Sequence, residues 1–137
     1  MIGVKVTGSW NGDKVKIQGK KVVGKTSYEL GLIVEGQAKL LADRKTGRMA
    51  ASITTQSKDK GTFPQGKGAI SSDKISKPRD DNEVLVGTPV FYAPYREFGT
   101  FKSDAHPFLR PALDLARGRK LTLLLENGKF LFADYLQ

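Results

Sequence analysis

The first apolar positions of the chain follow a two-residue period. Ile2, Val4 and Val6 alternate with small or polar residues, a pattern typical of a half-buried strand. The Asn-Gly pair at positions 11–12 is a turn signal. It predicts either a hairpin whose second strand includes residues 15–17 or the entrance to a helix, and the local pattern is compatible with both.

The pattern changes to a helical period over about residues 20–42. Apolar residues recur there at spacings of three, four and seven, which predicts a long amphipathic helix. Its apolar face consists of Val23, Leu30, Val34, Ala38 and Leu41. Glu35 and Lys39 form a favourable i,i+4 pair. Glycines at 24, 31 and 36 each weaken a helix by about 1 kcal/mol relative to alanine, so tertiary packing has to support this one.

Short strands and a long connection follow the helix. The β-branched residues after Met49 predict a strand from about position 51, and residues 83–87 predict a second strand. Between them, residues 57–82 are rich in Ser, Lys, Asp, Gly and Pro. A connection of that length is a functional loop, a disordered segment or a hairpin arm.

The C-terminal part allows two interpretations. Two prolines bracket Phe108, and proline is well tolerated in a first helical turn, so a helix from about that residue is predicted. Asn127-Gly128 then marks its end. The competing structure is a hairpin that pairs residues 121–126 with 129–133 around the same Asn-Gly turn.

Composition narrows the function classes. The 137 residues contain no cysteine, which excludes a disulfide scaffold, a Cys-ligated zinc site and a thiol nucleophile. One histidine excludes a multi-His metal centre. The apolar runs are too short to span a bilayer, and the first residues lack the layout of a signal peptide, so we expect a protein made in a cytoplasm that does not enter a membrane.

The net charge of +9 is distributed unevenly. Residues 1–25 carry +5, residues 57–80 carry +3, and residues 81–137 are neutral. The surplus suits contact with nucleic acid or an acidic protein surface, or else a solvated face that aids solubility. The basic residues of the central loop, which we expect to be an assembly loop, are Lys58, Lys60, Lys67, Lys74, Lys77 and Arg79.

Catalytic interpretations find little support. Residues 61–68 nearly spell a phosphate-binding loop, but Gly68 stands where a Ser or Thr would hold magnesium. Ser71, Ser72 and His106 lack the sequence context of a catalytic triad, and Glu97 with Asp104 has no sign of a glycosidase cleft. We therefore expect no enzyme, no catalytic residue, no cofactor and no metal.

Three segments carry a resemblance to a known family. Residues 92–100 read Tyr-Ala-Pro-Tyr-Arg-Glu-Phe-Gly-Thr, residues 107–113 read Pro-Phe-Leu-Arg-Pro-Ala-Leu, and residues 46–53 read Thr-Gly-Arg-Met-Ala-Ala-Ser-Ile. In order and spacing they resemble the minor tail components of long-tailed bacteriophages, which are implicated in head–tail joining or tail completion. The residues that match are Thr46, Gly47, Arg48, Ser52, Ile53, Tyr92, Ala93, Tyr95, Glu97, Phe98, Gly99, Thr100, Pro107, Phe108, Leu109, Arg110 and Pro111.

The resemblance implies a fold and a role. The fold is α+β: a long N-terminal helix and a C-terminal helix packed on a small, mostly antiparallel sheet, with a long central loop or hairpin arm. We expect one domain over 1–137, with a strand segment at 1–18, a core over about 20–126 and a flexible basic loop at about 57–82. The resemblance also favours the helix over the hairpin at the C-terminus.

The implied role is that of a virion structural protein of the neck, assembled in the host cytoplasm. Copies would form a ring, a hexamer or a dodecamer, between the head connector and the tail tube or tail terminator, with non-specific contact to passing DNA. A basic nucleic-acid-binding module is the alternative. We expect Glu97 to pair with Arg110 or Arg48 and so to tie two of the three segments together.

Overall fold

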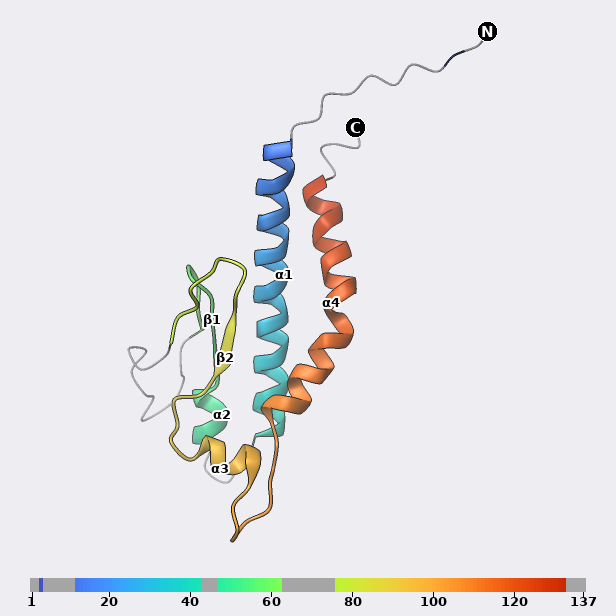
Figure 1. Ribbon diagram of the computed structural model, residues 1–137. Helices are drawn as coiled ribbons and strands as arrows, with labels where there is room; N and C mark the ends of the chain where they lie inside the picture. Colours follow the sequence, from blue (N-terminus) through green and yellow to red (C-terminus); the bar gives the residue numbers. More distant parts are fainter. Residues whose placement is uncertain (1–2, 4–11, 43–46, 63–75, 133–137) are drawn as a thin grey trace.

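The computed structural model describes Gly3 and residues 12–42, 47–62 and 76–132. It confirms the α+β architecture with two long helices and a small antiparallel sheet. In chain order the elements are α1 (Gly12–Leu41), α2 (Arg48–Ser52), β1 (Thr54–Gln56), β2 (Leu85–Gly87), α3 (Ala93–Phe98) and α4 (Leu109–Phe132) (Figure 1).

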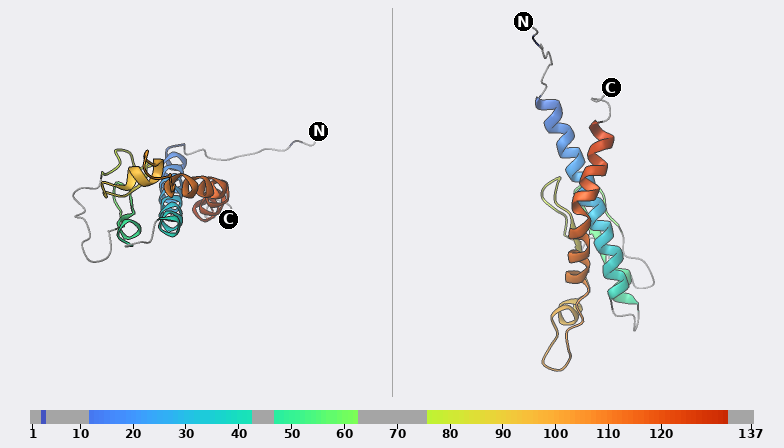
Figure 2. Two further views of the ribbon diagram at one scale, coloured as in Figure 1. Left: turned by 90° about the horizontal axis from the view of Figure 1, so that it is seen from below. Right: turned by 90° about the vertical axis from the view of Figure 1, so that its right-hand side faces the viewer.

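The elements are arranged in three layers. β1 and β2 pair antiparallel, with Thr55 opposite Val86, so the central loop is the connection of a β-hairpin. The helix α1 lies between this sheet and α4, and the two long helices cross at a shallow angle (Figures 1 and 2). The long N-terminal helix thus forms the centre of the molecule and contacts a different layer on each side.

The helix α1 begins at Gly12, eight residues before the predicted start. Residues 15–17 are helical, so the helix entrance is correct there and the hairpin is wrong. The strand segment predicted over 1–18 is wrong from residue 12 onward, and residues 1–2 and 4–11 lie outside the described part of the chain. The physical reason lies in α4, which runs beside α1 and gives its N-terminal half a surface on which to pack. Thr26 is buried at this contact, and Asn127 of α4 donates a hydrogen bond to its Oγ1 over 3.0 Å.

One helical glycine allows the close approach of α1 and the sheet. A Cβ atom at Gly31 would lie 2.7 Å from Thr55 Cγ2 and 2.7 Å from Val84 Cγ1. Real Cβ atoms do not approach other carbons so closely, because the interior is already at van der Waals contact. The helix-weakening residue therefore sits where the sheet requires it.

The strand predicted from position 51 is shorter than expected. Residues up to Ser52 form α2, which Gly47 precedes with φ +67°, and β1 covers only Thr54–Gln56. Alanines at 50 and 51 favour a helical turn, and only the three β1 residues find partners on β2. Ile53, between the two elements, is fully buried.

The C-terminal segment is one helix through Phe132, so the competing hairpin and the predicted stop at Asn127-Gly128 are both wrong. The Asn127 side chain is buried and donates to Thr26 Oγ1 and to Glu29 Oε2, the latter over 2.8 Å. A residue that usually favours turns is accommodated here by polar partners on α1. None of the helices in the described residues is long and apolar enough to cross a membrane.

Candidate assembly site

The three motif segments meet at one end of the molecule. They correspond to α2, to α3 and to the first turn of α4, which lie together at the lower end in Figure 1. Ile53, Ala93 and Phe108 each contribute a buried side chain to one core, shared with Val34 and Ala38 of α1. The motifs thus encode one packed unit and not three separate sites.

Glu97 is the polar centre of this unit. It is 7% exposed, and its carboxylate accepts hydrogen bonds from the backbone N–H groups of Phe108 (2.8 Å), Leu109 (3.1 Å) and Arg110 (3.0 Å). These are donors at the start of α4 that the helix itself cannot satisfy. Glu97 does tie the second motif to the third, through the backbone of the helix start.

The surroundings of Glu97 change its acidity. Burial raises the pKa of the carboxyl, but the three backbone hydrogen bonds and the charge of Arg110 outweigh burial and hold it below its ordinary value of 4.5. A carboxylate that is ionised, buried and bonded to three backbone donors has little capacity left for acid–base chemistry.

The short helix α3 has two faces of different character. Ala93 and Glu97, four residues apart, point inward and are buried. Tyr95 and Phe98 point outward and are 58% and 63% exposed. Phe91, two residues before the helix and 83% exposed, precedes Tyr95 by four residues.

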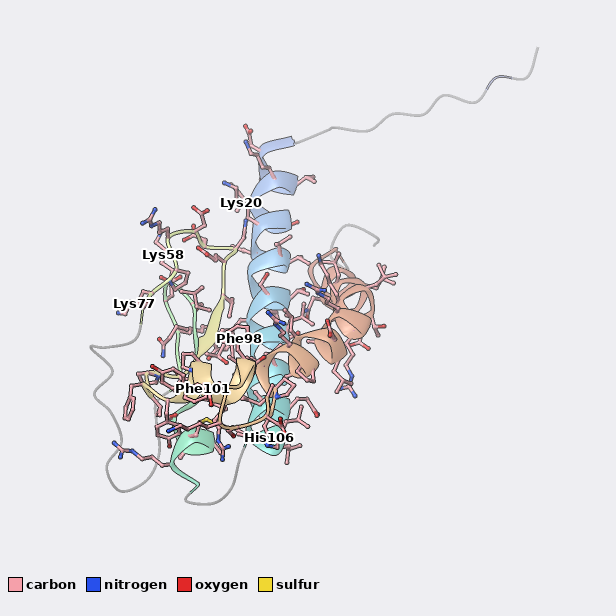
Figure 3. The ribbon with its side chains drawn as sticks, turned by 60° about the horizontal axis from the view of Figure 1, so that its bottom comes forward. Lys20, Lys58, Lys77, Phe98, Phe101 and His106 are labelled. Atoms are coloured by element: carbon pink, nitrogen blue, oxygen red, sulfur yellow. The ribbon has the colours of Figure 1, made fainter. Side chains whose placement is uncertain are left out.

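A tight turn after α3 presents a further aromatic ring. Gly99 adopts φ +76°, and a Cβ there would lie 2.8 Å from the backbone N of Ala105, so glycine is required on two grounds. Thr100 and Ser103 then exchange backbone hydrogen bonds of 2.8 and 3.3 Å, which places Phe101 at the tip, 94% exposed. Figure 3 shows Phe98 and Phe101 at the same end of the molecule.

Two cations accompany these rings. The Arg110 guanidinium lies 4.8 Å from the centroid of the Phe98 ring, and Lys102 Nζ lies 5.3 Å from that of Phe101. Such cation–π contacts are worth about 0.5–1 kcal/mol at exposed sites. The exposed aromatic end is therefore positively charged at its edge.

The remaining motif residues have mainly structural places. Ser52 is buried, donates to Met49 O over 2.7 Å and shares a hydrogen bond with the Thr88 hydroxyl. Tyr92 and Leu109 pack against the core, and Pro111 is half-buried. Arg48, Thr100 and Pro107 are exposed, and Thr46 lies outside the described residues.

A second buried carboxylate, Glu35, lies between α1 and the sheet, where the sequence indicated only an i,i+4 pair with Lys39. Glu35 accepts hydrogen bonds from Lys39, as its i,i+4 spacing predicted, and from the hydroxyls of Thr55 (2.7 Å) and Thr62 (2.8 Å). Burial raises the pKa of Glu35, but these hydrogen bonds and the Lys39 charge outweigh burial and lower it below 4.5. No periodic signal connects Glu35 with residues 20 and 27 positions away.

Acidic residues accompany the basic residues of the central loop in the part that the structure describes. Lys58, Lys60, Lys77 and Arg79 are exposed, but Lys58 pairs with Asp81 over 2.8 Å, and Arg79 N donates to Glu83 Oε2. Basic and acidic residues are equal in number over 57–62 and 76–84. Lys67 and Lys74 lie outside the described residues. Figure 3 shows Lys58 and Lys77 on this side of the molecule.

Of the catalytic candidates, the structure describes Glu97, Asp104 and His106. Ser71 and Ser72 lie outside the described residues, His106 is exposed with its backbone N bonded to Arg96 O, and Asp104 is exposed. In the described ranges no three His, Cys, Asp or Glu side chains form a group that could hold a metal ion.

Comparison of the chain with family models, curated proteins and solved structures finds no match. A function for the chain therefore has to rest on its own residues and on their geometry.

Proposed function

We propose that this chain is a virion structural protein of the neck of a tailed bacteriophage. Copies would form a ring that joins the head connector to the tail tube or completes the tail. The motif resemblance supports this proposal, because its three segments occur in the same order and build one end of the fold.

The observation that carries the proposal is the outward row of α3. A domain that remains a monomer is not stabilised by exposing several large aromatic side chains, because burying each of them would stabilise the fold by about 1.5–3 kcal/mol. The motif nevertheless directs Tyr95 and Phe98 outward while its small and capping residues face inward. This division is expected of a segment that both folds the subunit and contacts a neighbour.

The proposal is tested in the phage or prophage that encodes the chain. An early stop codon in its gene should yield DNA-filled heads and separate tails in electron micrographs, because a missing neck ring leaves the two halves without a joint. Expression of the intact chain in trans should restore joined particles.

A matched control uses a stop codon suppressed by a tRNA that inserts the native residue. Joined, infectious particles from the unsuppressed mutant would contradict the proposal, and so would the absence of the chain from purified virions by mass spectrometry.

A second candidate function, nucleic-acid binding, is favoured by the first half of α1. Five lysines there, Lys14, Lys16, Lys20, Lys21 and Lys25, are all exposed, and Lys25 has a long pair with Glu29 at 3.9 Å. A helix with such a surplus can neutralise phosphates without reading bases.

Salt dependence distinguishes this second function. A module that uses the five lysines should bind duplex DNA with an affinity that falls roughly 100-fold or more between about 50 and 200 mM salt, as measured by fluorescence anisotropy. Changing all five to glutamine should abolish the binding, whereas Lys58→Gln with Lys60→Gln should not. A monomer that binds tightly at physiological salt would favour the module over the neck protein.

A further inference from the structure

The strand β2 has one edge with free backbone groups. On β1, Thr55 N donates to Thr62 Oγ1 over 2.8 Å and Thr55 O accepts from Thr62 N over 2.9 Å, so the peptide groups of Thr55 point away from β2. Val86 lies opposite Thr55, and opposite residues of an antiparallel pair direct their peptide groups either toward each other or both away. The N–H and C=O of Val86 therefore point to the outer edge, where they have no hydrogen-bond partner among the described residues.

This edge lacks the usual protection against further pairing. Residues 84–87 contain no charged side chain and no proline. Among the described elements, those that pack closely on β2 are α1, on one face, and β1, at the other edge (Figure 1). An uncharged and uncovered edge strand is a template for another strand.

Apolar side chains lie beside the same edge. Val86 faces α1, because its Cγ2 would lie 3.6 Å from a Cβ at Gly31. Val86 and Leu30 of α1 are both partly buried against the main core. Val23, seven residues before Leu30, continues this side of α1 and is 41% exposed. A strand added to β2 with its apolar side chains toward α1 would shield these residues from water.

One segment outside the described residues has the pattern of such a strand. Residues 2–6 read Ile-Gly-Val-Lys-Val, with β-branched residues at every second position. Residues 63–75 contain a proline and two glycines and lack this alternation. The segments 43–46 and 133–137 contain no valine or isoleucine. The period-two pattern thus selects residues 2–6 as the occupant of the edge.

The length of the chain favours pairing with a second copy. Val86 lies level with Gly31, which is about 29 Å along α1 from Gly12. Residues 4–12 span at most about 29 Å even when fully extended. Since the sheet also lies to the side of the helix, Val4 cannot reach Val86 of its own copy, whereas β2 of another copy is free of this limit.

We infer that residues 2–6 of one copy of this chain add as an antiparallel strand to β2 of a second copy, with Val4 opposite Val86. The existing sheet is antiparallel, and purely antiparallel sheets are common. In this register the peptide groups of Val4 bond those of Val86, and those of Lys5 point to solvent.

The contact joins two different surfaces, so it is heterologous, and its repetition gives a ring if the rotation closes. The inference rests on the proposed function for that ring and deepens it by naming the contact between subunits.

Proline at neighbouring positions tests the register. In a fluorescence-anisotropy titration, a labelled peptide of residues 1–8 should bind the full-length Val4→Pro chain, whose own segment cannot pair. The same peptide carrying Val4→Pro should bind at least about 10-fold more weakly, because proline lacks the N–H that bonds Val86. A Lys5→Pro peptide is the matched control and should bind within about twofold of the unchanged peptide, since the Lys5 N–H points to solvent.

The absence of cysteine allows a test of where the segment binds. Residue 5 lies opposite residue 85 in the inferred register, in a pair whose Cα atoms are about 4.5 Å apart, which a disulfide can bridge. Under mild oxidation, Lys5→Cys combined with Leu85→Cys should form a ladder of multimers, and peptide mass spectrometry should find residue 5 linked to residue 85. Lys5→Cys with Leu40→Cys, an exposed leucine of α1, is the control and should give no ladder.

An unchanged peptide that does not bind would overturn the inference, and so would a Lys5→Pro peptide weakened as much as the Val4→Pro peptide. A link between residues 5 and 85 within one copy would also overturn it, because the pairing would then be intramolecular. If the link forms between copies but the chain is absent from virions, the contact stands and the neck function fails. A chain found in virions whose segment does not bind β2 is the reverse result.

Discussion

Thr54 and Thr55 are neighbours on β1 and both are almost completely buried, but their hydroxyls differ in hydrogen bonding. Thr55 Oγ1 lies 2.7 Å from Glu35 Oε2 and 3.1 Å from Gly31 O, whereas Thr54 Oγ1 has no hydrogen-bond partner among the described residues. An unmade bond at a buried hydroxyl costs free energy that a methyl group does not. The two positions therefore form a matched pair.

Valine at the two positions should give different results. Thr55→Val should lower the free energy of unfolding by about 1–3 kcal/mol, since it leaves a buried carboxylate short of a donor. Thr54→Val should leave it unchanged or raise it by up to about 1 kcal/mol. Urea unfolding followed by circular dichroism measures both, and equal losses for the two variants would contradict this assignment.

Glu97 gives a residue-scale prediction with a pH dependence. Glu97→Gln removes the charge that three backbone donors share, and it should destabilise the fold by about 1–3 kcal/mol at neutral pH. The native pKa lies below 4.5, so the stability that ionised Glu97 contributes is complete above pH 4.5 and is lost as the pH falls through the native pKa. The difference in free energy of unfolding between wild type and Glu97→Gln should therefore decrease as the solution becomes acidic.

Asp104→Asn is the control for this prediction, because Asp104 is an exposed carboxylate seven residues away. It should leave stability unchanged throughout the same pH range. Urea titration measures the difference in free energy of unfolding between wild type and Glu97→Gln. If this difference stays constant from neutral pH to pH 3, the capping role is refuted.

At the scale of elements, local pattern predicted which segments are helical better than where they end. The period of 20–42 indicated the first long helix correctly, and the prolines around Phe108 indicated the start of the second, whose continuation the pattern left open against a hairpin. The local pattern did not choose between a hairpin and a helix entrance at Gly12, and it did not predict the continuation of α4 past Asn127, because each depends on the other helix. Within the helix, the Asn127 side chain is satisfied by Thr26 and Glu29, about one hundred residues earlier, which accept its hydrogen bonds.

Glycines within α1 separate local from tertiary effects. Gly36→Ala should stabilise the protein by about 0.5–1 kcal/mol, since a Cβ there meets nothing within 4 Å and alanine favours helix. Gly31→Ala should destabilise it, because its Cβ would overlap Thr55 and Val84. The unfolding temperatures of the two variants test this prediction. A Gly31→Ala variant more stable than wild type would show that the sheet can move away from the helix.

Over the whole molecule, the described core is concentrated toward one end. The buried residues of α1 run from Val22 to Ala38, and none lies between Gly12 and Lys21. The sheet and the motif unit cover only the C-terminal half of α1, while the other half has α4 beside it and, at Gly24, a close approach of Asp81 from the hairpin connection (Figure 1). Stability should therefore be graded along the helix.

Native-state hydrogen exchange tests this gradient. Amides at positions 33–38 of α1 should be protected close to the global free energy of unfolding, and those at 16–20 should exchange by local opening at least 10-fold faster. Uniform protection along α1 would contradict the gradient. The variant with all five lysines of α1 changed to glutamine serves as a control. Its substitutions lie on the exposed surface of the half that opens first, so protection at positions 33–38 should not change.

The sequence by itself determined the period of the first long helix, the start of the second near Phe108, the short strands, the uneven charge and the three motif segments, because each is visible in spacings of a few residues. Only the tertiary structure decided that Glu97 caps α4, that Glu35 is buried beneath the sheet, that Gly31 is required, and that Tyr95 and Phe98 point outward while Ala93 points inward. Those outcomes depend on contacts between segments far apart in the chain, and the burial and hydrogen-bond energies of such contacts exceed the local preferences that a sequence pattern reflects.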